Sequence, residues 1–457
     1  MSIASCFAAQ TVVVLGLGRT GIYAALALQS GGSKVLAWDD TQFARSKAIQ
    51  KNIAVTELEG MDWSQVAAMV LSPGIPHKYP APHPIVVKAI AAGVPILSDI
   101  DVLGRCYPEA RYIGVTGTNG KTTTTSLIGH VLNCANVPTY VAGNIGTSVF
   151  SFEVTDPKST FVLEMSSFQL ELTSSIHFET AILLNLTPDH LIRHGGIEGY
   201  VAAKQSIFSG GNSAVIGVDS ILSRNIYQKM QGPKNVIPIS VHSVVPNGVY
   251  IDQGILVDDA FALQQPIVDL RDIPTLQGPH NGQNAAAAYI AAKQMGVSIP
   301  DIIEAFKSFT SLPHRQETVA MHNGVRYVND SKATNVDAAM QALARFDNIH
   351  WILGGRFKEE SLEVLYPYLN RVQHAYLIGE AADQFASWLE GRVVVTKSGT
   401  LEQAVASAAN QARKGAVVLL APACASFDQF KNFEARGEAF RQCVQDLSPL
   451  LRSGSNR

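Results

Sequence analysis

The sequence predicts an α/β fold with three domains, each organised around a mostly parallel sheet. Short runs of aliphatic and β-branched residues alternate with helical segments from one end of the chain to the other. Glycine-rich turns follow two of these runs, at Gly16–Gly21 and at Gly117–Gly120. A length of 457 residues also fits three domains, since a domain typically has about 150 residues.

The composition indicates a globular protein whose ligands are small molecules. Hydrophobic residues make up 47% of the chain, and 35 basic against 38 acidic residues give a net charge of −3. No basic run marks a surface for a polyanion, so we expect no binding of nucleic acid.

The cysteines and the N-terminus bear on the cellular compartment. The five cysteines are odd in number, far apart and without C-x-x-C spacing, which predicts neither a disulfide framework nor a zinc site. The segment Met1–Leu17 lacks the basic start of a signal peptide, and no uninterrupted apolar run approaches about 18 residues. We therefore expect a reducing, cytoplasmic location and no membrane insertion.

The first domain is predicted to be Rossmann-like, because it begins with a dinucleotide-type fingerprint. A strand over Thr11–Leu15 leads into the turn Gly16–Gly21 and a helix over Ile22–Gln29. A second strand over Lys34–Trp38 ends at Asp39, where such folds bring a carboxylate to a ribose hydroxyl. The helix N-terminus predicts a bound diphosphate, and the motif leaves open whether this belongs to a nicotinamide cofactor or to a UDP-sugar.

The remainder of this domain follows the same alternation. A strand over Ala67–Leu71 stops at the loop Ser72–Ile75, which faces the same crevice of the sheet. A helix over Pro84–Ala92 and a strand over Gly93–Leu97 complete the unit. We therefore expect a domain boundary at residue 99.

A phosphate-binding loop opens the central domain. In the stretch Tyr112–Thr125, a buried strand, a glycine-rich loop and a helix start follow one another. Gly117 and Gly120 allow backbone N–H groups to converge on an anion, Lys121 supplies a cation for the phosphates, and the Thr122 hydroxyl can hold Mg²⁺. The spacing departs from the strict G-x-x-x-x-G-K-[ST] pattern, because a valine occupies the first glycine position. The alternative, a plain turn before a threonine-rich helix, is disfavoured because consecutive β-branched residues are poor helix formers.

The later strands of the central domain carry polar residues at their C-terminal ends, where open parallel sheets bind ligands. Such strands are expected over Thr139–Asn144, Ser159–Glu164 and Ala181–Asn185. Short alternating strands over Val236–Leu270 predict a small antiparallel edge, and Asn281–Met295 predicts an alanine-rich helix.

A linker over Ser311–Arg315 separates the central domain, residues 100–311, from a Rossmann-like third domain, residues 312–457. The strands expected in the third domain are Val325–Asn329, His350–Leu353, Ala375–Ile378 and Ala416–Leu420. These strands alternate with helical segments, as in the first domain.

Several single residues allow two interpretations. Glu164 ends a hydrophobic strand where nucleotide-binding folds place a magnesium carboxylate, and His190 beside Asp189 is a candidate second ligand rather than a solvated loop histidine. Lys204, on an otherwise apolar helix, is interpreted as a lysine whose stem covers apolar surface while its ammonium reaches water. Arg315 is either a clamp for a γ-phosphate or a surface arginine.

Motifs spread over the whole chain together resemble the Mur ligases. They are Gly117–Thr122, Glu164–Gln169, Asp189-His190, Gly278–Asn281, Leu312–Arg315, Asn329–Asn335 and Pro422–Phe433. The last two are typical of the D-glutamate-adding branch of that family.

The resemblance implies ATP and two Mg²⁺ ions as cofactors of the central domain, which would be P-loop ATPase-like. The implied ATP-binding residues are Gly117, Thr118, Asn119, Gly120, Lys121, Thr122, Thr123, Asn284, Arg315 and Asp330. The implied metal ligands are Thr122, Glu164, His190 and Lys204, and the implied catalytic residues are Lys121, Lys204, His190 and Arg315. In the family, the lysine that matches Lys204 is carbamylated by CO₂, which turns a cation into a carboxylate-like ligand.

The resemblance also implies the substrates. The residues implied to hold UDP-N-acetylmuramoyl-L-alanine are Gly18, Arg19, Thr20, Asp39, Gly74 and Asn144. The residues implied to hold D-glutamate are Lys332, Thr334, Lys358, Ser426 and Phe433. The partners implied are these small molecules alone, and the chain is expected to act as a monomer.

The implied reaction is an ATP-dependent amide ligation in peptidoglycan precursor synthesis, through an acyl phosphate. Two other classes compete with it on the sequence. A nicotinamide dehydrogenase built on Gly16–Gly21 leaves the phosphate loop without a purpose. A P-loop switch protein lacks support because the chain contains no N-K-x-D guanine motif.

Overall fold

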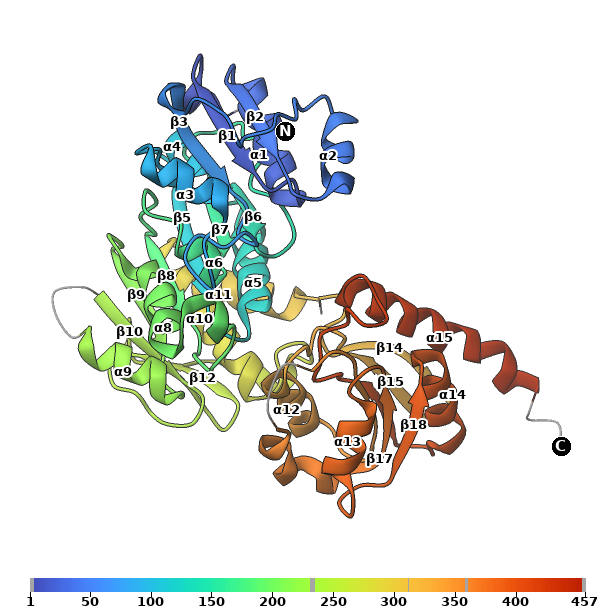
Figure 1. The fold of residues 1–457 in the computed structure, drawn as a ribbon. Helices are drawn as coiled ribbons and strands as arrows, with labels where there is room; N and C mark the ends of the chain where they lie inside the picture. Colours follow the sequence, from blue (N-terminus) through green and yellow to red (C-terminus); the bar gives the residue numbers. More distant parts are fainter. Residues whose placement is uncertain (1–3, 231–234, 311, 358–360, 454–457) are drawn as a thin grey trace. The chain divides into compact units, whose positions relative to one another are not determined.

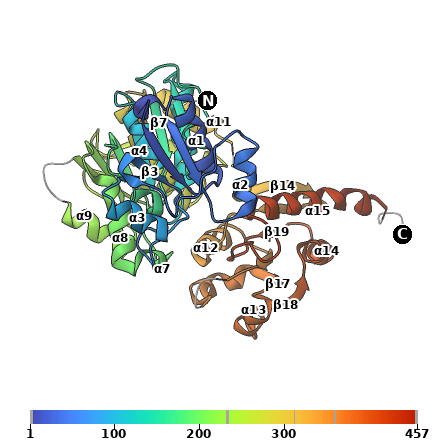
Figure 2. The ribbon, with the colours of Figure 1, turned by 45° about the horizontal axis from the view of Figure 1, so that its top comes forward.

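The structure is a computed structural model that describes residues 4–230, 235–310, 312–357 and 361–453 (Figure 1, Figure 2). It forms two compact units, Met1–Phe309 and Thr310–Arg457. The described strands form three sheets, of four, nine and six strands. The first two sheets lie in the N-terminal unit and the third in the C-terminal unit. The predicted α/β fold class with mostly parallel sheets is confirmed.

The four-stranded sheet is parallel throughout, in the order β2-β1-β3-β4. Its strands are β1 (Thr11–Leu15), β2 (Lys34–Trp38), β3 (Val66–Leu71) and β4 (Ile96–Leu97), and its helices are α1 (Arg19–Ser30), α2 (Gln42–Ile49), α3 (Pro84–Ala91) and α4 (Asp99–Cys106). The strand expected over Gly93–Leu97 is shorter than predicted. Gly93 has a φ of 74°, and its N–H and that of Val94 bond back to α3, so these residues end the helix instead of starting the strand.

The nine-stranded sheet has the order β13-β12-β11-β10-β9-β8-β5-β7-β6. Its strands are β5 (Arg111–Thr116), β6 (Thr139–Gly143), β7 (Thr160–Glu164), β8 (Thr180–Leu183), β9 (Ser213–Gly217), β10 (Asn235–Ser240), β11 (Val249–Asp252), β12 (Ile255–Asp258) and β13 (Gln265–Asp269). The helices of this part are α5 (Lys121–Cys134), α6 (Ser167–Leu170), α7 (Leu191–His194), α8 (Ile197–Gln205), α9 (Ile221–Lys229), α10 (Pro279–Gln294) and α11 (Ile299–Ser308).

The antiparallel edge predicted over Val236–Leu270 is smaller than expected. Only the pairs β11–β12 and β12–β13 are antiparallel, whereas β10 runs parallel to both of its neighbours, β9 and β11. Strand β9 was not predicted. Because α9 connects β9 to β10 as a crossover helix, β10 returns in the parallel direction.

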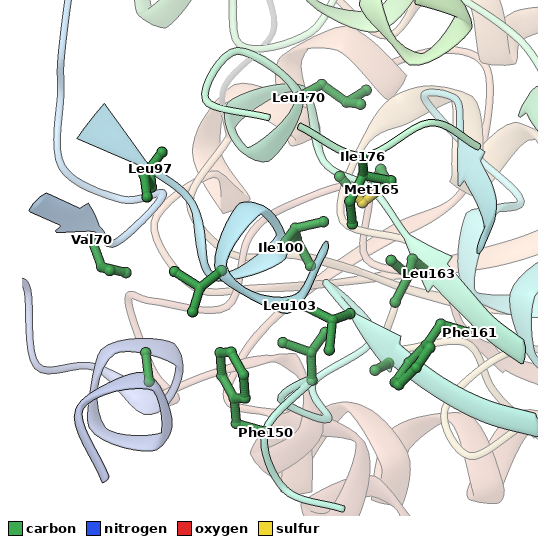
Figure 3. Close-up of a cluster of buried hydrophobic side chains, with 14 of the residues drawn as sticks. Val70, Leu97, Ile100, Leu103, Phe150, Phe161, Leu163, Met165, Leu170 and Ile176 are labelled. Atoms are coloured by element: carbon green, nitrogen blue, oxygen red, sulfur yellow. The ribbon is translucent and has the colours of Figure 1, made fainter. Parts of the chain in front are cut away.

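One buried apolar cluster connects the two sheets of the N-terminal unit (Figure 3). Ile100 and Leu103 of α4 lie between Val70 of the first sheet and Phe161 and Leu163 of the second. The predicted boundary at residue 99 falls on the first residue of α4, and this helix contributes its apolar face to a core that crosses the boundary.

The prediction that the cysteines form no disulfide is wrong for one pair. Cys6 and Cys106 form a disulfide, with Cα atoms 5.0 Å apart and a separation of 100 positions in the chain. The pair comes together because the short 3-10 helix Ser5–Phe7 packs against α4, a contact that residue spacing does not reveal. Cys134, Cys424 and Cys443 are not part of this disulfide.

The six-stranded sheet of the C-terminal unit has the order β14-β15-β19-β16-β17-β18, with only β14 antiparallel to its neighbour. Its strands are β14 (Glu317–His322), β15 (Val325–Asn329), β16 (Ile349–Gly354), β17 (Val372–Ile378), β18 (Val395–Gly399) and β19 (Val417–Leu420). Its helices are α12 (Val336–Arg345), α13 (Ala382–Leu389), α14 (Leu401–Gln411) and α15 (Phe433–Ser453), which packs on α14 and β14.

The four strands expected in this unit are confirmed, and the two edge strands β14 and β18 were not predicted. Edge strands are half-exposed and carry polar residues, so they lack a continuous apolar run. Ser311 of the predicted linker lies outside the described residues. Within the described part of the chain, no helix is both long and apolar enough to cross a membrane.

Candidate functional site

The phosphate loop follows β5, the strand that lies between β7 and β8 in the nine-stranded sheet. Glu164 at the end of β7 and Asn185 just after β8 therefore flank the loop. Asn185 Oδ1 accepts the Asn119 N–H at 2.9 Å and fixes one side of it. Gly117 and Gly120 have φ values of 153° and 84°, which favour glycine.

Two side chains at the start of α5 point back into the loop region. Lys121 Nζ donates to the carbonyl oxygens of Gly117 at 2.9 Å and Thr118 at 2.8 Å, so the ammonium lies across the loop. Thr122 Oγ1 donates to Glu164 Oε2 at 2.7 Å. The Thr123 side chain is half-buried in the next position of the helix. This arrangement suits an anionic phosphate at the positive end of α5.

Glu164 is 2% exposed, and its two oxygens are shared by a hydroxyl and an amide. Oε2 accepts from Thr122, and Oε1 accepts from Asn144 Nδ2 at 2.8 Å. A buried carboxylate beside a hydroxyl offers the hard oxygen ligands that Mg²⁺ prefers, so these residues fit the ion. Asn144, predicted to hold the UDP-substrate, is thus hydrogen-bonded to Glu164, the candidate metal ligand.

His190 lies at the N-terminus of α7 with a φ of 53°. Its Nε2 is 3.5 Å from Asp189 Oδ2, and its ring packs on Phe168 with centroids 5.1 Å apart. Among the described residues, no group of three or more His, Cys, Asp and Glu side chains is placed to hold a metal. His190 and Glu164 therefore belong to no such group in the described part of the chain.

The interpretation of Lys204 as a lysine that reaches water is wrong. The residue is 2% exposed, and its Nζ donates to the Gly117 carbonyl at 2.8 Å and to Thr116 Oγ1 at 3.3 Å. Burial first, and the Lys121 ammonium second, hold the pKa of Lys204 well below its usual value. The carboxylates of Asp189 and Glu164 oppose this shift but do not cancel it. The structure thus places an amine with a strongly lowered pKa directly under the phosphate loop.

The alanine-rich helix α10 supplies another residue to the loop. Asn284 is fully buried, and its Oδ1 accepts from Thr124 Oγ1 at 3.0 Å. A Cβ on Gly120 would lie 2.6 Å from the same Oδ1, so glycine is needed for this close approach. Asn284, predicted to bind ATP, lies against the loop and the first turn of α5.

The fingerprint turn of the first sheet is stabilised by Asp39. Its Oδ2 accepts the Leu17 N–H at 2.7 Å, and its Oδ1 accepts from the N–H and hydroxyl of Thr41. Burial raises the pKa of Asp39, but these hydrogen bonds outweigh burial and leave the pKa below its ordinary value. The Asp39 carboxylate, which was predicted to meet a ribose, thus accepts a hydrogen bond from the backbone of the turn.

The other residues predicted to hold the UDP-substrate lie around this turn. Gly18 precedes α1, while Arg19 and Thr20 form its first turn. Arg19 also donates to the carbonyl oxygen of Gly146, and Gly74 lies exposed in the loop after β3.

Replacing Gly21 by alanine should destabilise this site. A Cβ on Gly21 would lie 1.8 Å from the Gly16 carbonyl oxygen, so α1 would have to move away from the turn. Overpacking of this kind costs about 1–3 kcal/mol, which should lower the melting temperature by several degrees. Gly60→Ala is the matched control, because a Cβ there meets nothing within 4 Å. Equal melting temperatures for the two variants, measured by calorimetry, would contradict the close packing.

The C-terminal unit brings together two residues predicted to bind ATP. Asp330 follows β15 and is 6% exposed. Burial raises the pKa of its carboxyl to about 7, although the Arg315 guanidinium and the Gln316 N–H lower it. Arg315 is therefore close enough to Asp330 to act on it electrostatically, as expected of two groups around one ligand.

Four of the residues predicted to hold D-glutamate, namely Lys332, Thr334, Ser426 and Phe433, lie near the C-terminal edge of the same sheet. Lys332 Nζ lies 4.1 Å from the centroid of the Phe433 ring, and the two residues come from segments about 100 positions apart. Ser426 is buried after β19, and the N–H of Thr334 bonds to the Lys332 carbonyl. Lys358 lies outside the described residues.

A charged cluster that follows His190 in the chain was not predicted from the sequence. Arg193 donates to the carbonyl of Ile75 at 3.1 Å, and its NH1 is 3.5 Å from Glu171 Oε2. His194 Nδ1 is 2.7 Å from Glu171 Oε1. The helix that begins after His190 is thereby connected to the loop after β3. The available signal was the density of ionisable residues from 189 to 194.

Comparison with known proteins extends these observations. The family model described as Mur ligase middle domain matches residues 115–292, and the one described as Mur ligase, glutamate ligase domain matches residues 314–424. A protein of Rhodospirillum rubrum named UDP-N-acetylmuramoylalanine--D-glutamate ligase is 46% identical over 97% of this chain and 96% of its own length. Proteins of the same name from Caulobacter vibrioides and Mesorhizobium japonicum are 46% and 43% identical, over 97% and 99% of both chains.

Solved structures share the fold at low sequence identity. The UDP-N-acetylmuramate-alanine ligase MurC of Thermotoga maritima matches with a TM-score of 0.61 and 16% identity, over 96% of this chain and 99% of its own. The MurF ligase of Thermotoga maritima, described in complex with ADP, matches with a TM-score of 0.58 and 17% identity, over 97% of both chains.

Proposed function

The chain belongs to the Mur ligase family, and we infer that it uses ATP to join D-glutamate to UDP-N-acetylmuramoyl-L-alanine in peptidoglycan synthesis. The observation that carries this inference is the phosphate loop with Lys121 across it and the buried Thr122–Glu164 pair beside it. Relatives that are 43–46% identical over nearly the whole chain bear the name of this reaction.

The chemistry requires activation of a carboxylate, because a free carboxylate cannot lose oxide. An oxygen of the L-alanine carboxylate attacks the γ-phosphorus of ATP, and the bond from that phosphorus to the β–γ bridging oxygen breaks, which gives ADP and an acyl phosphate. The amine of D-glutamate then attacks the acyl carbon, and phosphate leaves as the amide forms and a proton is released. In our proposal, Lys121 and the N-terminus of α5 stabilise the charge on the transferring phosphoryl group, and Arg315 acts with them.

We propose that Thr122, Glu164, His190 and a carbamylated Lys204 hold two Mg²⁺ ions, which supply further charge neutralisation when bound. Carbamylation requires a neutral amine, whose nitrogen bonds to the carbon of CO₂ and loses a proton to water. The lowered pKa and the burial of Lys204 both support this reaction. The carbamate would supply a further oxygen ligand in addition to Glu164 and His190.

The domain assignment follows from the same proposal. Residues 1–99 hold the UDP-substrate through Gly18, Arg19, Thr20, Asp39 and Gly74, with Asn144 from the next domain. Residues 100–311 hold ATP, and residues 312–457 hold D-glutamate, with Asn284, Arg315 and Asp330 at the nucleotide.

Ser426→Ala should weaken the use of D-glutamate. The buried hydroxyl is proposed to donate to a substrate carboxylate, and a hydrogen bond to a charged group contributes about 1.5–3 kcal/mol. The KM for D-glutamate should therefore rise at least roughly tenfold, while the KM for the UDP-substrate stays close to wild type. Initial-rate kinetics test this, with the exposed Ser64→Ala, on the other unit, as the control. A rise confined to the UDP-substrate would overturn the assignment of Ser426.

The function itself is tested by ATP cleavage. Phosphate release should require UDP-N-acetylmuramoyl-L-alanine and D-glutamate together, and NADH should not bind. Steady ATP turnover without either small substrate would instead favour a switch or simple ATPase.

A further inference from the structure

Arg436, on the first turns of α15, was not singled out by the sequence and is the most deeply buried cation among the described residues of the C-terminal unit. The residue is 1% exposed. Its Nε donates to Ser331 Oγ at 3.0 Å, and its NH2 group donates to the carbonyl oxygens of Ser331 at 2.9 Å and Cys424 at 3.1 Å. A longer bond of 3.5 Å joins NH1 to the Gly354 carbonyl.

The three acceptor residues come from three adjacent strands. Ser331 follows β15, Cys424 follows β19 and Gly354 ends β16, and these strands are neighbours in the order β15-β19-β16. All three run parallel, so their C-terminal ends share the edge at which open α/β sheets bind ligands. One guanidinium therefore connects the three segments that leave this edge.

The segments that follow β16 and β19 pack closely against each other and against Arg436. A Cβ on Gly355 would lie 2.4 Å from the Ala425 carbonyl oxygen and 3.3 Å from NH1 of Arg436. Ser331 Oγ donates in turn to the carbonyl of Phe433 at 2.8 Å, and the Phe433 ring lies against Lys332. Lys332 and Phe433, which are proposed to meet D-glutamate, thus lie next to residues that hydrogen-bond with Arg436 or with Ser331.

The Asp428 carboxylate acts on Arg436 electrostatically, but none of the hydrogen bonds described above goes to a carboxylate. The hydrogen bonds of Arg436 go only to carbonyl and hydroxyl oxygens, and within the described residues it forms no ion pair. Burial lowers the pKa of Arg436 to about 10, so the group remains protonated at neutral pH. A buried cation without an ion-pair partner is costly for stability, and its positive field favours a ligand that carries two carboxylates.

We propose that Arg436 is a positioning residue for the D-glutamate site. It fixes the ends of β15, β19 and β16 relative to one another, and its charge favours the two carboxylates of the amino acid. This role rests on the proposed function. Arg436 would act on D-glutamate through the segments that it holds in place.

The test uses the full chain with Arg436→Met, Arg436→Lys and, as the matched control, Arg441→Met. Arg441 lies on the same helix but pairs with Glu317 at 2.6 Å and Glu438 at 3.0 Å rather than with Ser331, Cys424 or Gly354. Melting temperature and KM values for D-glutamate, ATP and the UDP-substrate are measured for each variant. Arg436→Met should raise the KM for D-glutamate at least roughly tenfold, since charged hydrogen bonds and their geometry are lost.

Arg436→Lys should have a smaller effect of the same kind, because charge is kept while the forked bonding is lost. The KM for the UDP-substrate should stay within about twofold in every variant, and Arg441→Met should leave all KM values within that range. If Arg436→Met does not fold, Arg436→Lys and Ser331→Ala decide by the same comparison.

An unchanged KM for D-glutamate in Arg436→Lys and Ser331→Ala would overturn the proposal. A parallel rise of all KM values with a lower melting temperature would do the same, because it would show a structural role alone. If the wild-type enzyme ligates a different amino acid and Arg436→Lys selectively raises the KM for that one, the substrate assignment is wrong and the positioning role stands.

Discussion

Lys121→Ala should lower ATP cleavage by at least about 10²–10³-fold, because it removes the cation that lies across the phosphate loop. Binding of UDP-N-acetylmuramoyl-L-alanine should change little, since its proposed residues lie mainly around the turn Gly16–Gly21. ADP release measures the first effect, and titration calorimetry with the UDP-substrate measures the second. Lys88→Ala is the control, because Lys88 is a half-exposed lysine of α3 whose Nζ donates to the Glu59 carbonyl.

This prediction separates two sites within the N-terminal unit. If both ATP cleavage and UDP-substrate affinity collapse while the melting temperature is unchanged, the assignment of separate sites is wrong. If neither changes, Lys121 does not act on the phosphates.

Lys204→Ala should lower activity by at least about 10²-fold, and added acetate should restore part of it. The reason is that the proposal assigns the role of Lys204 to its carbamate, and a small carboxylate can occupy the space left by the buried side chain. A bare ammonium in that place would be repelled by Mg²⁺ and by Lys121, whose charge already lowers the pKa of Lys204. Initial rates with increasing acetate measure the rescue.

The control for the rescue is Lys121→Ala, which acetate should not restore, because Lys121 acts as a cation. A ¹³C carbamate resonance should appear when the wild-type protein is supplied with ¹³C-bicarbonate. Full activity of a CO₂-free preparation without that resonance would show that the carbamate is not needed.

Local patterns were sufficient to predict the parallel core of each sheet. The strands Thr11–Leu15 and Thr160–Glu164 occur where they were expected, because buried parallel strands are nearly continuous apolar runs. The phosphate loop could be predicted for a related reason, since its glycines and Lys121 are adjacent in the chain. Edge strands such as β14 and β18 are polar and half-exposed, so no run marks them.

Features that depend on packing could not be predicted from the sequence. Lys204 was interpreted as a solvent-reaching lysine because the sequence of α8 alone does not reveal that the Lys204 ammonium is hydrogen-bonded to Thr116 and Gly117. Cys6 and Cys106 meet only because a short helix packs on α4. Arg436 resembles any other arginine on an amphipathic helix until the ends of three strands surround it.

The central claim is the identity of the amino acid that is joined to the UDP-substrate. The most direct measurement incubates the protein with ATP, Mg²⁺, UDP-N-acetylmuramoyl-L-alanine and an equimolar mixture of D- and L-amino acids, followed by mass spectrometry of the UDP-linked product. The account predicts one product, heavier by one glutamyl residue, which forms with D-glutamate alone and does not form with L-glutamate alone. A product that carries L-alanine or a diamino acid instead, or no product with ATP consumed, would contradict it.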